Sequence, residues 1–271
     1  MEFNHILKVI KQKIIIKMKI YFRYPLNIFS VLLQPIIWLT PYYFMNKVFG
    51  NGSSFKQMTG SDNYMEFIVL GFVLASYLTA AMWGAGFSLK EEMWDGVLES
   101  NYTMPVSRVV LMISNILFEF IMATIEIVLT ITVCYFAFHI NLTHGILKSL
   151  IFIIPGIISY IGIGLIIGSI VLILKNANTV VDVSSGLMQG FSGTSFPIEI
   201  FPKALLIISF VLPLTYMNDS VRALIIGVNP IIDLKYQFAI LIFMMFIFLA
   251  LGIFIFNKVD NKCRQEGISG Y

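Results

Sequence analysis

The chain alternates long apolar stretches with short polar ones, a pattern typical of a protein that crosses a membrane several times. A helix needs about 20 apolar residues to cross the hydrocarbon core of a bilayer. The pattern predicts six membrane-spanning helices: 26–45, 64–87, 109–138, 146–174, 179–194 and 238–256. The third is long enough for roughly 45 Å of helix, so we expect it to tilt or to extend beyond the bilayer.

A further apolar region, 196–227, is interrupted by prolines and charged residues. These are Pro197, Pro202, Pro213, Lys203, Asp219 and Arg222. The spacing predicts two short helices, one from Pro202 through Phe210 and one from Tyr216 to a cap at Gly227. Non-helical backbone at membrane depth must be buried in protein or face water. We therefore expect a re-entrant helical hairpin that closes the outer mouth of the bundle.

Residues 1–25 are basic and amphipathic. On a helical wheel an apolar face opposes a polar one: Leu7, Ile10, Ile14, Met18 and Tyr21 against Lys8, Gln12, Lys19 and Arg23. This arrangement predicts a helix lying in the inner membrane interface with its basic face toward anionic headgroups. The helix should end before Pro25. The alternative is that these charges serve only to orient the chain.

Charge and composition support a multi-pass membrane protein. With the N-terminus inside, the inner segments hold about twice as many Lys and Arg residues as the outer ones, which predicts that both termini are cytoplasmic. Hydrophobic residues make up 58% of the chain and charged residues 12%, with a mean hydropathy of +0.86. Soluble domains carry about 25% charged residues, so a free-standing soluble enzyme is excluded. The small net charge of +3 gives no support to a nucleic-acid partner.

Motifs of catalysis and nucleotide binding are missing from the sequence. There is no G-x-x-x-x-G-K-[ST], no H-E-x-x-H and no G-x-S-x-G. His139 and His144 lie in an expected outer loop, where solvated histidines are commoner than metal ligands. We expect a non-enzymatic chain with no metal and no cofactor of its own.

Two carboxylates lie inside the third span. Glu119 and Glu126 are seven residues apart and therefore share one helical face. A carboxylate in hydrocarbon costs several kcal/mol, so both should face the interior of the bundle. They could line a substrate path or a proton site, or they could make structural hydrogen bonds between helices. The proton-site interpretation would suit an ion- or proton-coupled carrier.

The segment 89–105, between the second and third spans, is both acidic and apolar. It carries Glu91, Glu92, Asp95 and Glu99 beside Trp94, Val97, Leu98, Tyr102 and Met104. That is too apolar for a plain connector, and Pro105 would end any helix formed there. We expect a short amphipathic helix that faces a cytoplasmic partner.

This segment and the hairpin resemble the ABC-2 family of transporter permeases, the membrane subunits of bacterial ATP-driven exporters of the drug-resistance type. The family's first motif reads like E-x-x-x-G-x-L-E-x-x-x-x-x-P-V-S-R, and the chain supplies Glu92, Gly96, Leu98, Glu99, Pro105, Val106, Ser107 and Arg108. The second reads like S-G-x-x-x-P-x-x-x-x-P followed by L-P-L-T-Y and an arginine. The chain supplies Ser192, Gly193, Pro197, Pro202, Leu212, Pro213, Leu214, Thr215, Tyr216 and Arg222. One departure is Trp94–Asp95, where family members often carry a basic residue.

The resemblance covers the whole chain and implies an all-α membrane protein with one domain, 1–271. Two permeases would pair, either two copies or this chain and a paralogue, and each would dock a separate ATPase that binds ATP and Mg. Residues implied to contact the ATPase through a coupling helix are Glu92, Gly96, Val97, Leu98, Glu99, Tyr102, Pro105 and Arg108. Residues implied to form an extracellular gate are Phe196, Pro197, Pro202, Pro213, Tyr216 and Arg222.

The resemblance also implies a central cavity lined by the second and fifth spans. With the two carboxylates of the third span, the predicted substrate path comprises Tyr77, Met82, Trp83, Glu119, Glu126, Met188, Gln189 and Phe191. The predicted function is export of a hydrophobic drug, antibiotic or lipid-like compound across a bacterial plasma membrane by alternating access. The direction of transport follows from the resemblance alone. The identity of the cargo and the choice between homodimer and heterodimer stay open.

Overall fold

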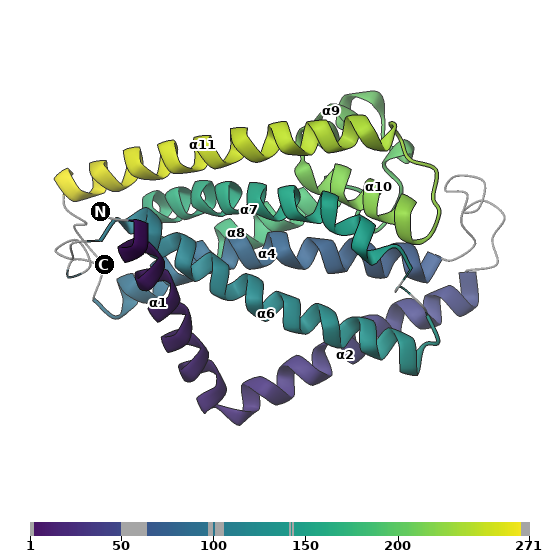
Figure 1. Ribbon diagram of the computed structural model, residues 1–271, viewed down its shortest axis with the longest axis horizontal. Helices are drawn as coiled ribbons and strands as arrows, with labels where there is room; N and C mark the ends of the chain where they lie inside the picture. The colour runs from purple at the N-terminus through teal and green to yellow at the C-terminus, as the bar shows by residue number, and fades with distance from the viewer. Residues whose placement is uncertain are drawn as a thin grey trace.

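The structure is a computed structural model that describes residues 3–49, 64–96, 100, 106–140, 142 and 144–266. Within these residues all regular structure is helical, which confirms the predicted all-α class (Figure 1). The helices are α1 (Phe3–Arg23), α2 (Pro25–Phe49), α4 (Tyr64–Trp94), α6 (Arg108–Ala137), α7 (Ile146–Leu174), α8 (Ala177–Phe191), η1 (Ile198–Ile200), α9 (Lys203–Val211), α10 (Pro213–Ile225) and α11 (Leu234–Glu266).

Five of these helices, α2, α4, α6, α7 and α11, are long and apolar enough to cross a membrane. The pair α9 and α10, bent by 89°, adds a sixth candidate as a broken span or re-entrant loop. The predicted fourth span, 146–174, coincides with α7. The second extends seven residues beyond its predicted end at 87, to Trp94. The sixth lies inside the longer helix α11.

Helix α8 is shorter than the predicted fifth span, 179–194, and starts earlier. Its 15 residues form about 22 Å of helix, less than the roughly 30 Å of a hydrocarbon core. It ends because Gly193 adopts a left-handed conformation, with φ +71°, and Pro197 follows. In Figure 1, α8 stops part-way along the bundle, and α9 and α10 occupy the remaining length. Helix α8 is therefore not among the candidate spans, and the bent pair α9–α10 is the further candidate in this part of the chain.

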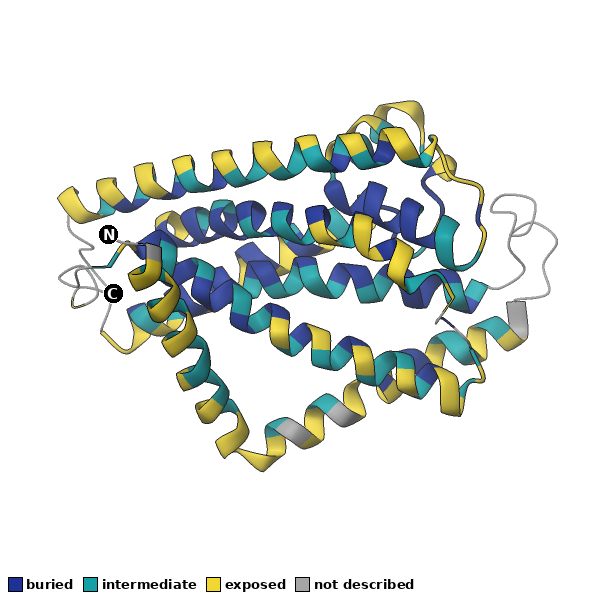
Figure 2. Ribbon diagram, in the orientation of Figure 1, coloured by how far each residue is buried: buried dark blue, intermediate teal, exposed yellow. Residues whose placement is uncertain are grey.

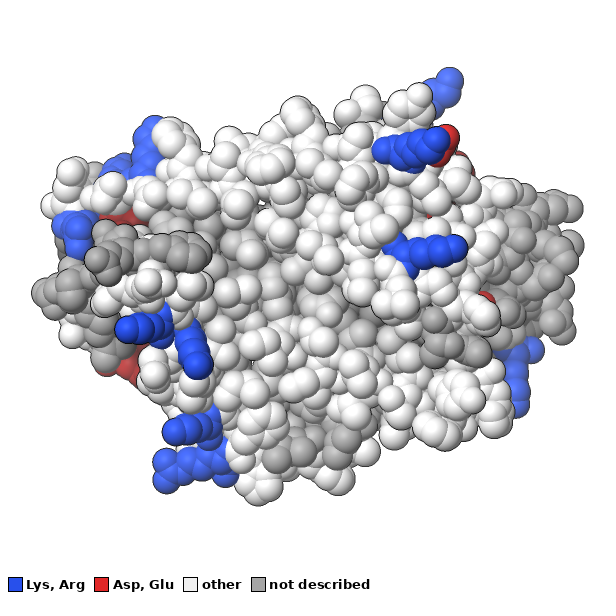
Figure 3. Space-filling view, in the orientation of Figure 1, with Lys and Arg blue, Asp and Glu red and all other residues white. Residues whose placement is uncertain are grey.

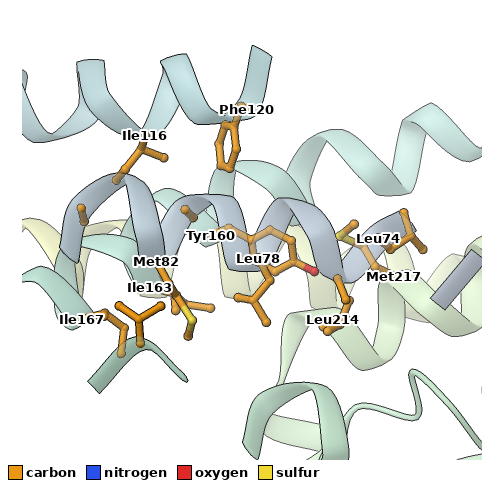
Figure 4. Close-up of a cluster of buried hydrophobic side chains, with 14 of the residues drawn as sticks. Leu74, Leu78, Met82, Ile116, Phe120, Tyr160, Ile163, Ile167, Leu214 and Met217 are labelled. Carbon is orange, nitrogen blue, oxygen red and sulfur yellow. The ribbon is translucent and has the colours of Figure 1, made fainter. Parts of the chain in front are cut away.

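The core lies between α4, α6, α7 and α10. Ten side chains of this core are labelled in Figure 4: Leu74, Leu78, Met82, Ile116, Phe120, Tyr160, Ile163, Ile167, Leu214 and Met217. Against this core α7 and α11 run side by side (Figure 1). Their backbones touch where Gly162 meets Gly252, since a Cβ on either glycine would overlap the other helix. Small residues permit such close helix contacts in membranes.

The outer surface fits a bilayer. Helices α2 and α11 are mostly exposed, and Figure 2 shows the buried residues concentrated on α4, α7 and α10. Exposed side chains on α11 include large apolar ones such as Phe243, Phe246 and Phe254, which lipid would cover. On the face in Figure 3 the charged side chains lie toward the two ends of the bundle and along α1, and the middle is uncharged.

Helix α1 ends at Arg23, before Pro25, as predicted, and packs mainly against α6. Leu7, on the predicted apolar face, is 48% exposed. Two lysines turn toward the bundle: Lys13 reaches Glu92, and the Lys17 ammonium lies 5.5 Å from the centre of the Phe118 ring. In Figure 1 the Phe3 end of α1, the Trp94 end of α4 and the Glu266 end of α11 lie at the same end of the molecule.

Candidate functional site

A cavity of about 620 Å³ lies midway along the bundle, between α2, α4, α6 and α8, with Tyr21 of α1 at its wall. We call it the intramembrane cavity. Small-molecule sites typically measure about 300–1,000 Å³, so the volume suits a drug-sized ligand. Its aromatic wall consists of Tyr21, Trp38, Tyr42, Phe72 and Trp83. Its polar lining includes Gln34, Ser76, Thr79, Ser185, Gln189, Glu119, Glu126 and Asp182.

Four residues of the predicted substrate path line this cavity. Trp83 comes from α4, Glu119 and Glu126 from α6, and Gln189 from α8. The Gln189 amide donates to the Thr79 hydroxyl over 3.0 Å and so links α8 to α4. The structure thus brings together the carboxylates and part of the two spans that the resemblance singled out.

The other four predicted path residues lie outside the cavity lining. Met82 is completely buried on the core side of α4, beside Ile163 and Ile167 (Figure 4). The Tyr77 hydroxyl lies 2.9 Å from the Thr124 hydroxyl, at the α4–α6 contact. Further along the chain, Met188 packs partly buried against the core. Phe191 packs against Phe201, with ring centroids 6.0 Å apart.

Helices α1 and α2 contribute residues that sequence reasoning missed. Tyr21, Gln34, Trp38 and Tyr42 all line the cavity. A signal was available for Gln34, because a lone amide inside an otherwise apolar span needs a polar environment. The aromatic residues carried no such signal, since aromatic side chains occur throughout the chain.

Glu119 and Glu126 have no ion pair and no side-chain hydrogen bond among the described residues. Both are only partly buried, and both face the cavity. The positive charge of Lys17 acts on Glu119 from α1. The interpretation that they make structural hydrogen bonds between helices is therefore not supported by the described part of the chain.

At the end of the bundle that holds the α4–α6 connection, four charged residues form what we call the Arg108 network. Arg108, which begins α6, is 5% exposed. Its Nη2 lies 3.1 Å from Glu92 Oε2, and its Nε lies 3.2 Å from Asp260 Oδ1. The Lys13 ammonium lies 3.9 Å from Glu92 Oε1. The network therefore joins α1, α4, α6 and α11.

Glu92 and Arg108, both implied by the resemblance to contact an ATPase, are members of the Arg108 network. Buried charges are stable when they are paired, and these two pair with each other inside the bundle. Helix α4 also continues unbroken from the second span to Trp94, so residues 89–94 of the predicted coupling segment belong to α4. Gly96 follows in a left-handed conformation, φ +66°, and is exposed. Val97, Leu98, Glu99, Tyr102 and Pro105 lie outside the described residues.

Burial changes the protonation of one member of this network. It lowers the pKa of Lys13 to about 8, and the nearby Glu92 carboxylate opposes this shift. Lys13 belongs to α1, which lies before the first span. Its charge therefore becomes variable at mildly alkaline pH.

At the other end of the bundle, Arg222 holds the hairpin in place. The side chain is 3% exposed. Its Nε and Nη2 donate to the Phe67 carbonyl over 3.1 and 2.8 Å, its Nη1 to the Gly193 carbonyl over 2.7 Å, and its Nη2 also to the Thr194 carbonyl over 2.7 Å. These bonds connect α10 to the start of α4 and to the loop after α8. Gly71 leaves room for them, since a Cβ there would overlap Thr194 and Arg222.

The other predicted gate residues take different places in the hairpin. Pro213 is buried and begins α10, three residues before the predicted start at Tyr216, because proline suits the first turn of a helix. The buried Tyr216 donates from its hydroxyl to the Phe210 carbonyl over 3.0 Å. Pro197 is buried, whereas Pro202 and Phe196 are exposed. The Phe196 ring packs edge-on against Phe201.

Comparison with protein-family models finds a match to the ABC-2 type transporter over residues 9–226. This range contains the intramembrane cavity, the hairpin and three of the four members of the Arg108 network. No curated protein matches the chain. Because the match covers well over half of the sequence, the chain belongs to the ABC-2 type transporter family and is a membrane permease subunit.

Proposed function

We propose that this permease exports a hydrophobic drug, antibiotic or lipid-like compound from a bacterial cell, and that a separate ATPase chain hydrolyses the ATP. The observation that carries the proposal is the intramembrane cavity, because it offers drug-sized space and polar anchors between helices of which α2, α4 and α6 are long and apolar enough to cross a membrane. The sequence holds no P-loop, so the proposal assigns ATP and Mg to the partner.

The two ends of the bundle support an alternating-access mechanism. At one end the hairpin, fixed by Arg222, would act as the extracellular gate. At the other end the Arg108 network fastens the α4–α6 connection to α1 and α11. Movement imposed on that connection by an ATPase would therefore pass to four helices together. Such coupling requires contacts with the ATPase that differ between the two states.

The partner composition is testable by co-purification. We expect the tagged chain, extracted in mild detergent, to retain a second permease and an ATPase at about one per permease, which is the ratio that the family architecture implies. Native mass spectrometry gives the masses and the stoichiometry. Reconstituted vesicles should then hydrolyse ATP faster when cargo is present. A chain that recruits no ATPase from co-expressed candidates would contradict the proposal.

A second candidate is an ion- or proton-driven carrier that uses Glu119 and Glu126. The observation in its favour is that both carboxylates face the cavity without an ion pair in the described part of the chain. The two candidates differ in their energy source. Transport that continues without any ATPase and stops when the proton gradient is collapsed would favour the carrier.

A further inference from the structure

We propose that the intramembrane cavity selects a positively charged amphiphile, that is, a lipophilic cation with aromatic or aliphatic groups. The proposal rests on the function above only where it calls this ligand the cargo. Binding itself needs neither an ATPase nor transport.

Carboxylates lie on two walls of the cavity. Glu119 and Glu126 project from α6, about 10.5 Å apart along its axis, and Asp182 lies on α8. A cation between these helices would meet negative charge from both. Among the described residues no Lys or Arg lines the cavity. The positive charge of Lys17 acts on Glu119 from outside the cavity. Glu126 and Asp182 are then the carboxylates whose charge a bound cation would neutralise.

This charge arrangement favours a ligand of one sign. A carboxylate held in a low-dielectric site without a counter-ion raises the free energy of the protein. A bound cation would supply the missing counter-charge, whereas an anion would be repelled. A neutral ligand would desolvate the carboxylates without compensating them. The acidic lining therefore distinguishes among ligands of the same size and shape.

The aromatic wall adds a second attraction for the same class of ligand. The Phe72 ring lies 5.3 Å from the Tyr42 ring and 6.4 Å from the Trp38 ring, measured between centroids, so the three rings form one surface. Trp83 lines the cavity from further along α4. Aromatic faces, tryptophan above all, attract cations within about 6 Å and also bury apolar groups. Aromatic and acidic walls together match a molecule that is both cationic and lipophilic.

The proposal is tested with two ions of matched shape and opposite charge, tetraphenylphosphonium and tetraphenylborate. Each is titrated into the purified full-length chain in neutral detergent by calorimetry, with empty micelles as the blank. Fluorescence of Trp38 and Trp83 in a Trp94→Phe background reports binding at the cavity, because Trp94 is 81% exposed at the end of α4. We expect tetraphenylphosphonium to bind at least about tenfold more tightly, which corresponds to about 1.4 kcal/mol.

Neutral isosteres of the carboxylates identify their role. The double variant Glu119→Gln/Glu126→Gln should lose the preference for the cation and still bind tetraphenylborate, which shows that the cavity is intact. Asp182→Asn, at an exposed position, should weaken tetraphenylphosphonium binding severalfold and provides a second test if the double variant does not fold. The matched control is Asp233→Asn, an exposed carboxylate outside the cavity, which should bind like the unmodified chain.

Equal affinity for the two ions would overturn the proposal. So would a preference for the cation that survives in both the double variant and Asp182→Asn. Neither result would affect the proposal of an ATP-driven exporter, because that proposal does not depend on the charge of the cargo. Conversely, if the chain binds the cation selectively and recruits no ATPase, the proposal of a cation-selective cavity stands and the proposal of an ATP-driven exporter is contradicted.

Discussion

At the scale of single residues, Arg222 and Lys13 show two ways of burying a positive charge. Arg222 donates to three backbone carbonyls, and its guanidinium lies 3.4 Å from the centre of the Phe67 ring. Its planar fork of donors fits this arrangement, and an ammonium group does not. Lys13 pairs with Glu92 at 3.9 Å, and burial disfavours its charge.

Arg222→Lys should destabilise the protein by about 2–4 kcal/mol, because lysine leaves buried carbonyls without donors. The effect is measured as a lower temperature of thermal unfolding in detergent. The control is Arg23→Lys, the same change at an exposed side chain at the end of α1, which should leave that temperature unchanged. Equal unfolding temperatures for the two variants would show that the four hydrogen bonds contribute nothing.

Lys13 predicts a pH dependence of stability. Its folded pKa of about 8 lies below the ordinary 10.5, so between these values the unfolded chain binds more protons than the folded one. The free energy of unfolding should therefore gain a contribution from Lys13 as pH rises from about 8 to 10.5. Unfolding curves of Lys13→Gln should lack this gain. Those of Lys11→Gln, an exposed neighbour on α1, should keep it.

At the scale of helices, the apolar pattern predicted most bounds well, and α7 coincides with its predicted range. Side-chain direction was harder to predict, because one residue step turns a helix by about 100°. Met82 and Trp83 are neighbours, yet one lies in the core and the other in the cavity. The pairing of Arg108 with Asp260 could not be predicted either, since it depends on how α6 and α11 meet.

The contact between α4 and the loop after α8 depends on Gly71. Gly71→Ala should lower the unfolding temperature, because the added methyl would overlap the Thr194 carbonyl and the Arg222 side chain. Gly186→Ala on α8 is the matched control, since a methyl there meets open space. Alanine favours helix over glycine by about 1 kcal/mol, so this control should be neutral or more stable. A destabilised control and an unaffected Gly71→Ala would contradict the packing described.

At the scale of the whole molecule, the bundle has the hairpin at one end and the Arg108 network at the other. The cavity lies between them, bounded by α2, α4, α6 and α8. Residues 97–105, in which most of the proposed ATPase contact lies, include Glu99 of the acidic segment singled out in the sequence.

Glu99→Arg should uncouple ATP hydrolysis from transport while the chain still inserts into the membrane, because it reverses a charge in the proposed ATPase contact. Reconstituted vesicles should show transport reduced about tenfold or more per ATP hydrolysed. The control is Asp233→Arg, a charge reversal at an exposed site between α10 and α11, which should transport normally. Normal transport by Glu99→Arg would remove residue 99 from the contact.

The meeting of Gly162 and Gly252 has a consequence for how the molecule can move. Where two backbones touch, neither helix can slide or rotate without a collision, so α7 and α11 form a stiff frame. Helices α2 and α8 have no comparable glycine contact among the described residues, and both border the cavity. A change of shape that opens or empties the cavity therefore requires α2 and α8 to move, while α7 and α11 keep their positions relative to each other.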